Sequence, residues 1–361
     1  MLRYLIPPNK TLIVRGPASF TLTRGRAKIF EAPLVQYTNM VVQRDKQLSI
    51  ESEDVAEIEL ALSRTGEIME MDGSCVPKSW RKLVDILTNI DKGIVMIIGP
   101  SDVGKSTLCT YVMNVLINRR RHVRVLDADI GQAEIGPPTT ISTSTPTRPS
   151  PTLAHLEPER MYFVGHNTPS FVQSRVLEGI KRMLCPDFRG VTIVNTDGWV
   201  HDAAAIMYKR ELISTVNPDK LVGIGPIDSF NSVVHTTKIH PLVVESPEVI
   251  LIRTRRERKE IRRIGYQRFL ARSTSYTLKL DNVKLKLRKS IMEAFSKRNI
   301  NMSNVILGFL NDKGFLDQIG ILESMTRSNL TVYSRRNHQP VIIEFGYVRL
   351  ARDGTEQGYL D

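Results

Sequence analysis

Residues 93–107 read GIVMIIGPSDVGKST, and this stretch decides the fold. An apolar run up to Ile98 predicts a buried strand, and the following GPSDVGKS, which begins at Gly99, matches the phosphate-binding pattern G-x-x-x-x-G-K-[ST]. The glycines let backbone amides turn toward phosphate oxygens, and a helix expected to begin near Lys105 adds the partial positive charge of its N-terminus. The sequence therefore predicts a nucleotide-phosphate site between a strand and a helix.

Each residue of this loop receives an expected role. Lys105 would reach the β and γ phosphates, and the Ser106 hydroxyl would ligate magnesium. The remaining residues expected to contact the nucleotide are Gly99, Pro100, Ser101, Asp102, Val103, Gly104 and Thr107.

Two carboxylates end the next apolar run, in VLDADIGQ. Alternation along a strand would place Asp127 and Asp129 on one face, at the carboxyl edge of the sheet beside the loop. One would hold the magnesium, directly or through water, and one could accept the proton of an attacking hydroxyl. The alternative is that an Asp only caps the following turn, and it carries more weight for Asp127 than for Asp129.

The segment VNTDGW ends another apolar run, so its polar residues are expected at the same sheet edge, where loops bind ligands. Thr196 could hydrogen-bond a substrate, and Gly198 could allow its close approach. Trp199 could stack on a base or belong to the core, and the sequence leaves both interpretations open.

A strongly basic helix is expected near residues 255–272. Its spacing places Arg255, Arg258 or Lys259, and Arg262 on one face, which could close over a transferring phosphoryl group. Residues 251–300 hold 16 basic and four acidic side chains, which accounts for the whole net charge of +12 and indicates a polyanionic partner. A solvated charged helix, or a nonspecific RNA grip, is the alternative.

The length of 361 residues predicts two or three domains. Short β-like runs broken by Gly and Pro predict an N-terminal β domain over 1–75. Apolar runs alternating with helical stretches predict a P-loop domain over 76–272 with a lid helix about 253–272, and short β-like runs return over 273–361. A loop is expected over 136–151 and a strand near VILIRT (249–254), and a helix is expected to pack through Trp80, Leu83, Val84 and Leu87.

Composition excludes several classes of protein. No apolar run approaches the ~20 residues that span a bilayer, and the first residues carry no long apolar stretch, so a cytoplasmic protein without membrane contact is expected. The three cysteines at 75, 109 and 185 are odd in number and widely spaced, which argues against a disulfide framework or a four-thiolate zinc site.

Together, GPSDVGKST, DADIGQAEIGPP, NTDGW and the Arg-rich helix resemble the polynucleotide 5'-hydroxyl kinase family. This family includes the kinase subunit of eukaryotic pre-mRNA cleavage factor, and the resemblance is to its compact archaeal members, over nearly the whole chain. It implies an α/β fold: a central P-loop NTPase parallel sheet with flanking helices, an N-terminal β-sandwich-like domain and a small C-terminal β-rich domain. It also implies transfer of the γ-phosphoryl of ATP, with Mg2+, to the 5'-hydroxyl of RNA, with DNA as a further candidate.

The resemblance also implies residue roles. Asp129, in a segment similar to the family's D-x-G-Q, would be metal-linked and the base for the 5'-hydroxyl, and Arg258 and Arg262 resemble the lid arginines. The residues that resemble the substrate-binding positions are Gln132, Thr196 and Gly198. The helix continues as GYQRFL instead of the family's Tyr-Phe-Tyr-Gly type of ending, so the alternatives for the lid residue are Arg255, Arg256 and Arg263.

Two other functions stay open at this point. One is a catalytically silent ATP-binding scaffold in RNA processing, and the other is a small-molecule kinase, which would leave the localised basic charge without a purpose. A regulatory GTPase is disfavoured because the sequence has no N-K-x-D segment. Nothing in the sequence predicts a protein partner.

Overall fold

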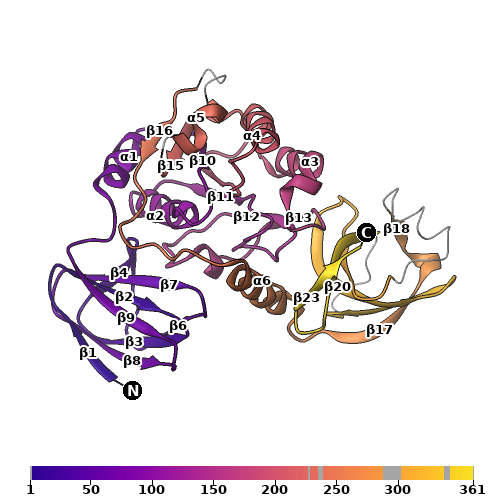
Figure 1. Cartoon of the computed structure of the whole chain (residues 1–361), viewed down its shortest axis with the longest axis horizontal. Helices are drawn as coiled ribbons and strands as arrows, with labels where there is room; N and C mark the ends of the chain where they lie inside the picture. The colour runs from indigo at the N-terminus through magenta and orange to yellow at the C-terminus, as the bar shows by residue number, and fades with distance from the viewer. Residues whose placement is uncertain (1, 227, 235–238, 288–301, 337–341, 361) are drawn as a thin grey trace. The chain divides into compact units, whose positions relative to one another are not determined.

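The computed structural model describes residues 2–226, 228–234, 239–287, 302–336 and 342–360 (Figure 1). The chain divides into two compact units, each of which makes most of its contacts within itself. Unit 1 comprises Met1–Val125, Thr145–Leu156 and Pro186–Glu257, and unit 2 comprises Leu126–Ser144, Glu157–Cys185 and Arg258–Asp361. The division into 1–75, 76–272 and 273–361 stays a prediction. The part of the basic window at 288–301 lies outside the described residues.

The N-terminal part of unit 1 is a β-sandwich. Its two antiparallel sheets, over the described residues up to Asp72, have the strand orders β1-β8-β3-β6 and β5-β4-β7-β2-β9. Alternating apolar residues from both sheets, among them Leu12, Phe20 and Ile58, fill the space between them. The strands are β1 (Leu2–Ile6), β2 (Lys10–Arg15), β3 (Ala18–Arg24), β4 (Ala27–Ile29), β5 (Ala32–Pro33), β6 (Asn39–Val42), β7 (Gln47–Ser52), β8 (Ala56–Leu62) and β9 (Glu67–Asp72).

The rest of unit 1 contains parallel strands in the order β14-β10-β15-β16. They are β10 (Gly93–Ile98), β14 (Val191–Asn195), β15 (Lys220–Ile224) and β16 (Leu242–Val244). The helices of this part are α1 (Lys78–Thr88), α2 (Lys105–Asn118), α4 (Ala203–Val216) and α5 (Asp228–Val234), with the short 3-10 turn η1 (Leu153–His155). The four apolar residues predicted to bury one face of α1 are all buried, which confirms that helix.

Unit 2 combines a small α/β part with a C-terminal sheet. The first part contains β12 (Thr140–Ser144), β13 (Arg160–Phe163), η2 (Pro169–Phe171) and α3 (Gln173–Met183). Two elements, β11 (Val123–Asp127) and α6 (Arg255–Leu270), cross from unit 1 into unit 2. The C-terminal sheet consists of β17 (Thr274–Lys279), β18 (Lys284–Lys286), β19 (Val305–Leu310), β20 (Leu316–Met325), β21 (Asn329–Ser334), β22 (Ile342–Leu350) and β23 (Glu356–Tyr359), with η3 (Leu280–Asn282) between β17 and β18.

The structure confirms the predicted fold class and corrects two local expectations. Residues 136–151 are not all loop, because β12 pairs antiparallel with β13 and all five of its residues are buried. The flanking prolines favour a loop prediction, but the residues between them include Thr and Ile, which favour strands. VILIRT is not a strand: the amide of Gln47 donates to the Val249 carbonyl and the Arg253 amide donates to the Asp102 carboxylate, so side chains satisfy the backbone there.

Within the described ranges, no helix is both long enough and apolar enough to cross a membrane.

Candidate active site

The phosphate loop follows β10 and continues into the first turn of α2, so Gly99–Thr107 lie at the predicted junction of a strand and a helix. Gly104, the N-cap of α2, has a φ of 99°, a conformation that suits glycine. The first turn of α2 carries no acidic residue, so the partial positive charge of the helix N-terminus is not neutralised there.

Two side chains of the loop have defined partners. Lys105 is buried, and its Nζ donates to the carbonyl oxygen of Pro100 at 2.6 Å. The Ser106 hydroxyl accepts a hydrogen bond of 3.3 Å from Nδ2 of Asn195, the last residue of β14. The loop therefore presents an ammonium and a hydroxyl at the N-terminus of α2, the groups that phosphate and magnesium require.

The turn Thr196–Trp199 seats directly on the phosphate loop. A Cβ on Gly198 would lie 2.5 Å from the backbone nitrogen of Ser101, so only glycine fits there. Thr196 is fully buried, and its hydroxyl donates to the Ile97 carbonyl at 2.8 Å. The close approach predicted for Gly198 is thus to the loop itself, and the Thr196 hydroxyl serves the neighbouring strand.

Asp197 anchors this turn from inside. Its Oδ2 lies 2.9 Å from Nζ of Lys209 and accepts a 3.1 Å hydrogen bond from the Tyr208 hydroxyl, while Oδ1 accepts from the Trp199 amide at 3.0 Å. Lys209 is fully buried and also donates to the Asp197 carbonyl at 2.9 Å. Trp199 stacks on Tyr208 with ring centroids 5.6 Å apart, and its indole donates to Asp202 at 2.7 Å.

The two predicted carboxylates, both in unit 2, have different surroundings. Asp127 is fully buried, and its Oδ2 accepts hydrogen bonds from the amides of Glu134 at 2.7 Å and Ile135 at 3.2 Å. Asp129 is half-buried, and its Oδ1 accepts from the amides of Gly131 at 3.1 Å and Gln132 at 2.9 Å. Because β11 ends at Asp127, only the first carboxylate belongs to the strand, and it braces the loop that presents the second.

The basic helix α6 is capped and tethered along its length. The Glu257 amide donates to the Thr254 hydroxyl at 3.3 Å, and the Thr254 amide donates back to the Glu257 carboxylate at 2.5 Å, which forms a capping box. In unit 2, Gln132 Nε2 donates to the Arg258 carbonyl at 3.4 Å. The same side chain therefore links the loop that holds Asp129 to the helix that holds the predicted arginines.

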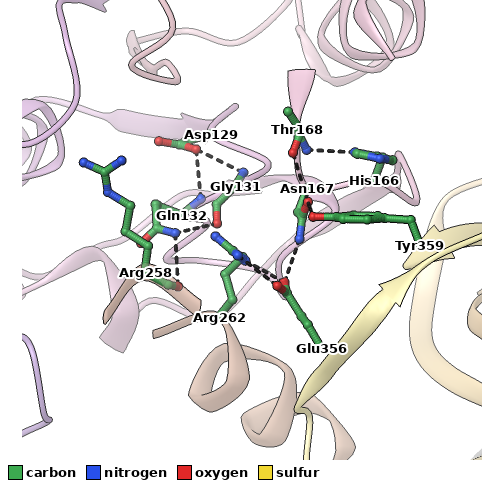
Figure 2. A network of polar contacts seen from close by, with 10 residues as sticks. All are labelled: Asp129, Gly131, Gln132, His166, Asn167, Thr168, Arg258, Arg262, Glu356 and Tyr359. Carbon is green, nitrogen blue, oxygen red and sulfur yellow. Dashed lines mark hydrogen bonds and ion pairs between the residues drawn. The ribbon is translucent and has the colours of Figure 1, made fainter. Parts of the chain in front are cut away.

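Two arginines of the helix pair with carboxylates, one within the helix and one on another element. Arg263 pairs with Glu260 at 2.7 Å within the helix. Arg262 instead pairs with Glu356 of β23, at 2.6 Å (Figure 2). The sequence gives no signal for this partner, which lies 94 residues away.

The chain is similar to several known proteins. The family model of the P-loop of the mRNA cleavage and polyadenylation factor CLP1 matches residues 99–272. A polyribonucleotide 5'-hydroxyl-kinase of Pyrococcus horikoshii is 27% identical over 320 residues, covering 74% of this chain and 88% of that protein. One from Methanocaldococcus jannaschii is 26% identical over 325 residues, covering 74% of this chain and 90% of that protein. The chain is thus similar to archaeal polyribonucleotide 5'-hydroxyl kinases over most of its length, and its residues 99–272 match the CLP1 P-loop family.

A solved structure has a similar fold. A chain in the Clp1p–Pcf11p complex matches with a TM-score of 0.72 at 13% identity, covering 96% of this chain and 97% of that chain. The family model begins at the first glycine of the phosphate loop and ends two residues beyond α6, so it includes every candidate site residue. The resemblance read from the sequence motifs is therefore confirmed.

Sequence reasoning missed four side chains that support the candidate site. Asn195 contacts the Ser106 hydroxyl, and Lys209 neutralises Asp197. Arg253 contacts the carboxylate of Asp102 in the phosphate loop, with Nη1 at 3.2 Å from Oδ1. Glu356 is the fourth. Asn195 directly precedes the T-D-G-W segment and could have been found as a polar residue at a strand end, whereas the other three are defined by distant partners.

Proposed function

We propose that the chain is an ATP-dependent polynucleotide 5'-hydroxyl kinase that transfers the γ-phosphoryl of ATP to the 5'-hydroxyl end of RNA. The observation that carries the proposal is the phosphate loop, in which Lys105 and Ser106 stand at the N-terminus of α2 and Gly198 seats on Ser101. Similarity to archaeal proteins named polyribonucleotide 5'-hydroxyl kinases supports RNA as the acceptor. DNA with a free 5'-hydroxyl is a second acceptor to test.

The proposed nucleotide site uses the backbone of Gly99–Thr107 and the side chain of Lys105. In this structure Lys105 donates to its own loop, at the Pro100 carbonyl, and γ-phosphate oxygens would replace that acceptor. The residues that would hold magnesium are Ser106 and Asp129, with Asp127 bracing the carboxylate loop from within. A hydroxyl and a carboxylate are oxygen donors of the kind magnesium prefers, and the ion would neutralise charge on the phosphates.

In the proposed reaction the 5'-hydroxyl oxygen forms a bond to the γ-phosphorus of ATP. The bond between that phosphorus and the oxygen bridging to the β-phosphate breaks, and ADP leaves. Asp129 accepts the hydroxyl proton and releases it to solvent. Arg258 and Arg262 would stabilise negative charge on the transferring group, because guanidinium keeps its charge and pairs bidentately with phosphate oxygens.

Substrate contacts are proposed for Gln132 and Gly198, since one borders Asp129 and the other borders the phosphate loop. Thr196 would support substrate binding indirectly, because its buried hydroxyl fixes the turn that carries Gly198.

The test is transfer of radiolabel from γ-labelled ATP to 5'-hydroxyl RNA and DNA oligonucleotides of the same sequence, with and without Mg2+. We expect label on RNA with a free 5'-hydroxyl, no label on the 5'-phosphorylated control, and none with Lys105→Ala. Binding of ATP without transfer to either oligonucleotide would overturn the kinase proposal in favour of an ATP-binding scaffold.

A further inference from the structure

An acidic side chain from the C-terminal strand β23 meets the basic helix α6 in unit 2. Arg262 Nε donates to Glu356 Oε1 at 2.6 Å, and Arg262 Nη2 donates to Glu356 Oε2 at 2.9 Å. Only 13% of the Arg262 side chain and 5% of the Glu356 side chain are exposed. Two parallel hydrogen bonds fix both the position and the plane of the guanidinium.

Glu356 is itself held in place by its neighbours. Asn167 Nδ2 donates to Glu356 Oε1 at 2.6 Å, and the Tyr359 hydroxyl donates to Asn167 Oδ1 at 2.9 Å. The His166 ring stacks on Tyr359, with centroids 4.9 Å apart and an interplanar angle of 11°. The carboxylate therefore cannot swing to another position without breaking the three hydrogen bonds it accepts.

The same cluster adjoins the loop that carries Asp129 (Figure 2). Gly131 lies against the backbone of Asn167, where an added Cβ would be 2.8 Å from the Asn167 carbonyl oxygen. The Gly131 amide in turn donates to Asp129 at 3.1 Å. A short path of contacts thus joins the proposed base, through Asn167 and Glu356, to Arg262.

The side-on pairing leaves one nitrogen of Arg262 for another acceptor. Glu356 engages Nε and Nη2, and Nη1 makes no hydrogen bond with the residues that the structure describes. Burial lowers the pKa of Arg262, but the hydrogen bonds and the negative charge of Glu356 outweigh it and raise the pKa above its ordinary value. The guanidinium stays charged, oriented on one edge and able to donate from the other.

We propose that Glu356 is a positioning residue for phosphoryl transfer: it orients the guanidinium of Arg262, and through Asn167 it fixes that group relative to the loop of Asp129. The inference rests on the proposed function. The C-terminal hairpin, formed by β22 and β23, would thereby support the reaction, although Glu356 itself touches no substrate. Orientation matters here because a displaced catalytic group loses much of its effect on the transition state.

Steady-state kinetics of Glu356→Gln test the proposal in the full-length protein. Gln keeps the shape of the side chain and one acceptor oxygen but loses the charge that aligns both edges of the pair. We expect kcat to fall by about tenfold to a hundredfold, with KM for ATP changed by less than about twofold. The matched control is Glu323→Gln, which removes the carboxylate paired with Arg352 in the same unit and should leave kcat unchanged.

A second comparison separates orientation from mere stabilisation of the hairpin. Glu356→Ala is introduced into wild-type protein and into Arg262→Ala. If Glu356 acts only through Arg262, it lowers kcat in the wild type and has less than about twofold effect in the Arg262→Ala background. The same loss in both backgrounds, or a kcat for Glu356→Gln equal to or above that of the wild type, would overturn the proposal.

The two levels of inference fail differently. A wild-type protein without transfer activity overturns the proposed function, and the positioning role with it. An active wild type whose kcat is insensitive to Glu356→Gln overturns only the positioning role.

Discussion

The turn Thr196–Trp199 in unit 1 and the loop Asp129–Gln132 in unit 2 look alike in sequence, because each is a polar segment just after an apolar strand. Their structures differ. In the turn, the Thr196 hydroxyl and the Asp197 carboxylate point inward and are satisfied by buried groups. In the loop, Asp127 takes the inward role and leaves Asp129 half-buried on a short turn.

This difference separates two uses of a carboxylate at a strand end. The buried contacts of Asp197 hold the turn that places Gly198 against the phosphate loop. Those of Asp127 stabilise the loop that follows its own strand. Asp129 is bound by local amides, so it stays at the edge of the fold, where chemistry is possible. Mutations at these positions should therefore split into losses of turnover and losses of stability.

The largest expected effect is on turnover, from Asp129→Asn. We expect kcat to fall by about 10³-fold, equivalent to about 4 kcal/mol, because the amide cannot accept the hydroxyl proton. The free energy of unfolding should change by less than about 1 kcal/mol, since Asn still accepts from the local amides. Quench-flow turnover and urea unfolding of the same sample check both values, and a wild-type kcat contradicts the role of base.

Asp197→Asn should act on stability instead. Removing this charge leaves Lys209 fully buried without its counterion, so we expect the free energy of unfolding to fall by about 3 kcal/mol. Urea titration measures the loss. The double variant Asp197→Asn with Lys209→Met should recover part of it, and a double variant no more stable than the single one would argue against the buried pair.

Thr196→Val should cause a smaller loss of stability than Asp197→Asn. Valine keeps the shape but loses one buried hydrogen bond to Ile97, so the free energy of unfolding should fall by about 1 kcal/mol. KM for the oligonucleotide should not change, and Thr196→Ser serves as the control that keeps the hydroxyl. A KM raised about tenfold at unchanged stability would instead place the hydroxyl on the substrate.

The smallest effect is expected at Asp202, which caps α4, the helix that supplies Tyr208 and Lys209. The hydrogen bond from the Ala205 amide, followed by that from the Trp199 indole, lowers the pKa of Asp202. Its charge therefore stabilises the fold above about pH 4, and this contribution is lost as the pH falls through the lowered pKa.

Asp202→Asn isolates that contribution, because Asn keeps the capping oxygen but carries no charge. We expect a slightly lower melting temperature than wild type at pH 7 and a difference that shrinks as the pH falls below about 4. A difference that is independent of pH would mean that the charge of Asp202 contributes nothing.

The sequence predicted the phosphate loop, the helices α1 and α2 and the alternation of apolar strands with helices because each depends on spacing within a short window. Local patterns could also place Thr196 at a strand end. They could not tell which way its hydroxyl points, because its acceptor is the backbone of another strand, at Ile97.

The other contacts that the sequence does not predict have the same physical origin. The ion pair of Lys209 with Asp197 depends on how α4 packs below the turn, and the ion pair of Arg262 depends on Glu356 of β23, 94 residues away. In β12, the buried Thr and Ser residues look like a polar linker, although their pairing with β13 makes them core. Such contacts are set by packing over long sequence separations.

The chain passes back and forth between the two units, and this path has a consequence for synthesis. Unit 1 is complete only when residue 257 has been made, and unit 2 only at the last segment. A nascent chain that has just emerged with the phosphate loop still lacks the residues that seat on it, such as Gly198 and Arg253. No single cut in the polypeptide leaves both units whole. Neither unit is therefore encoded by one uninterrupted segment that could be expressed alone.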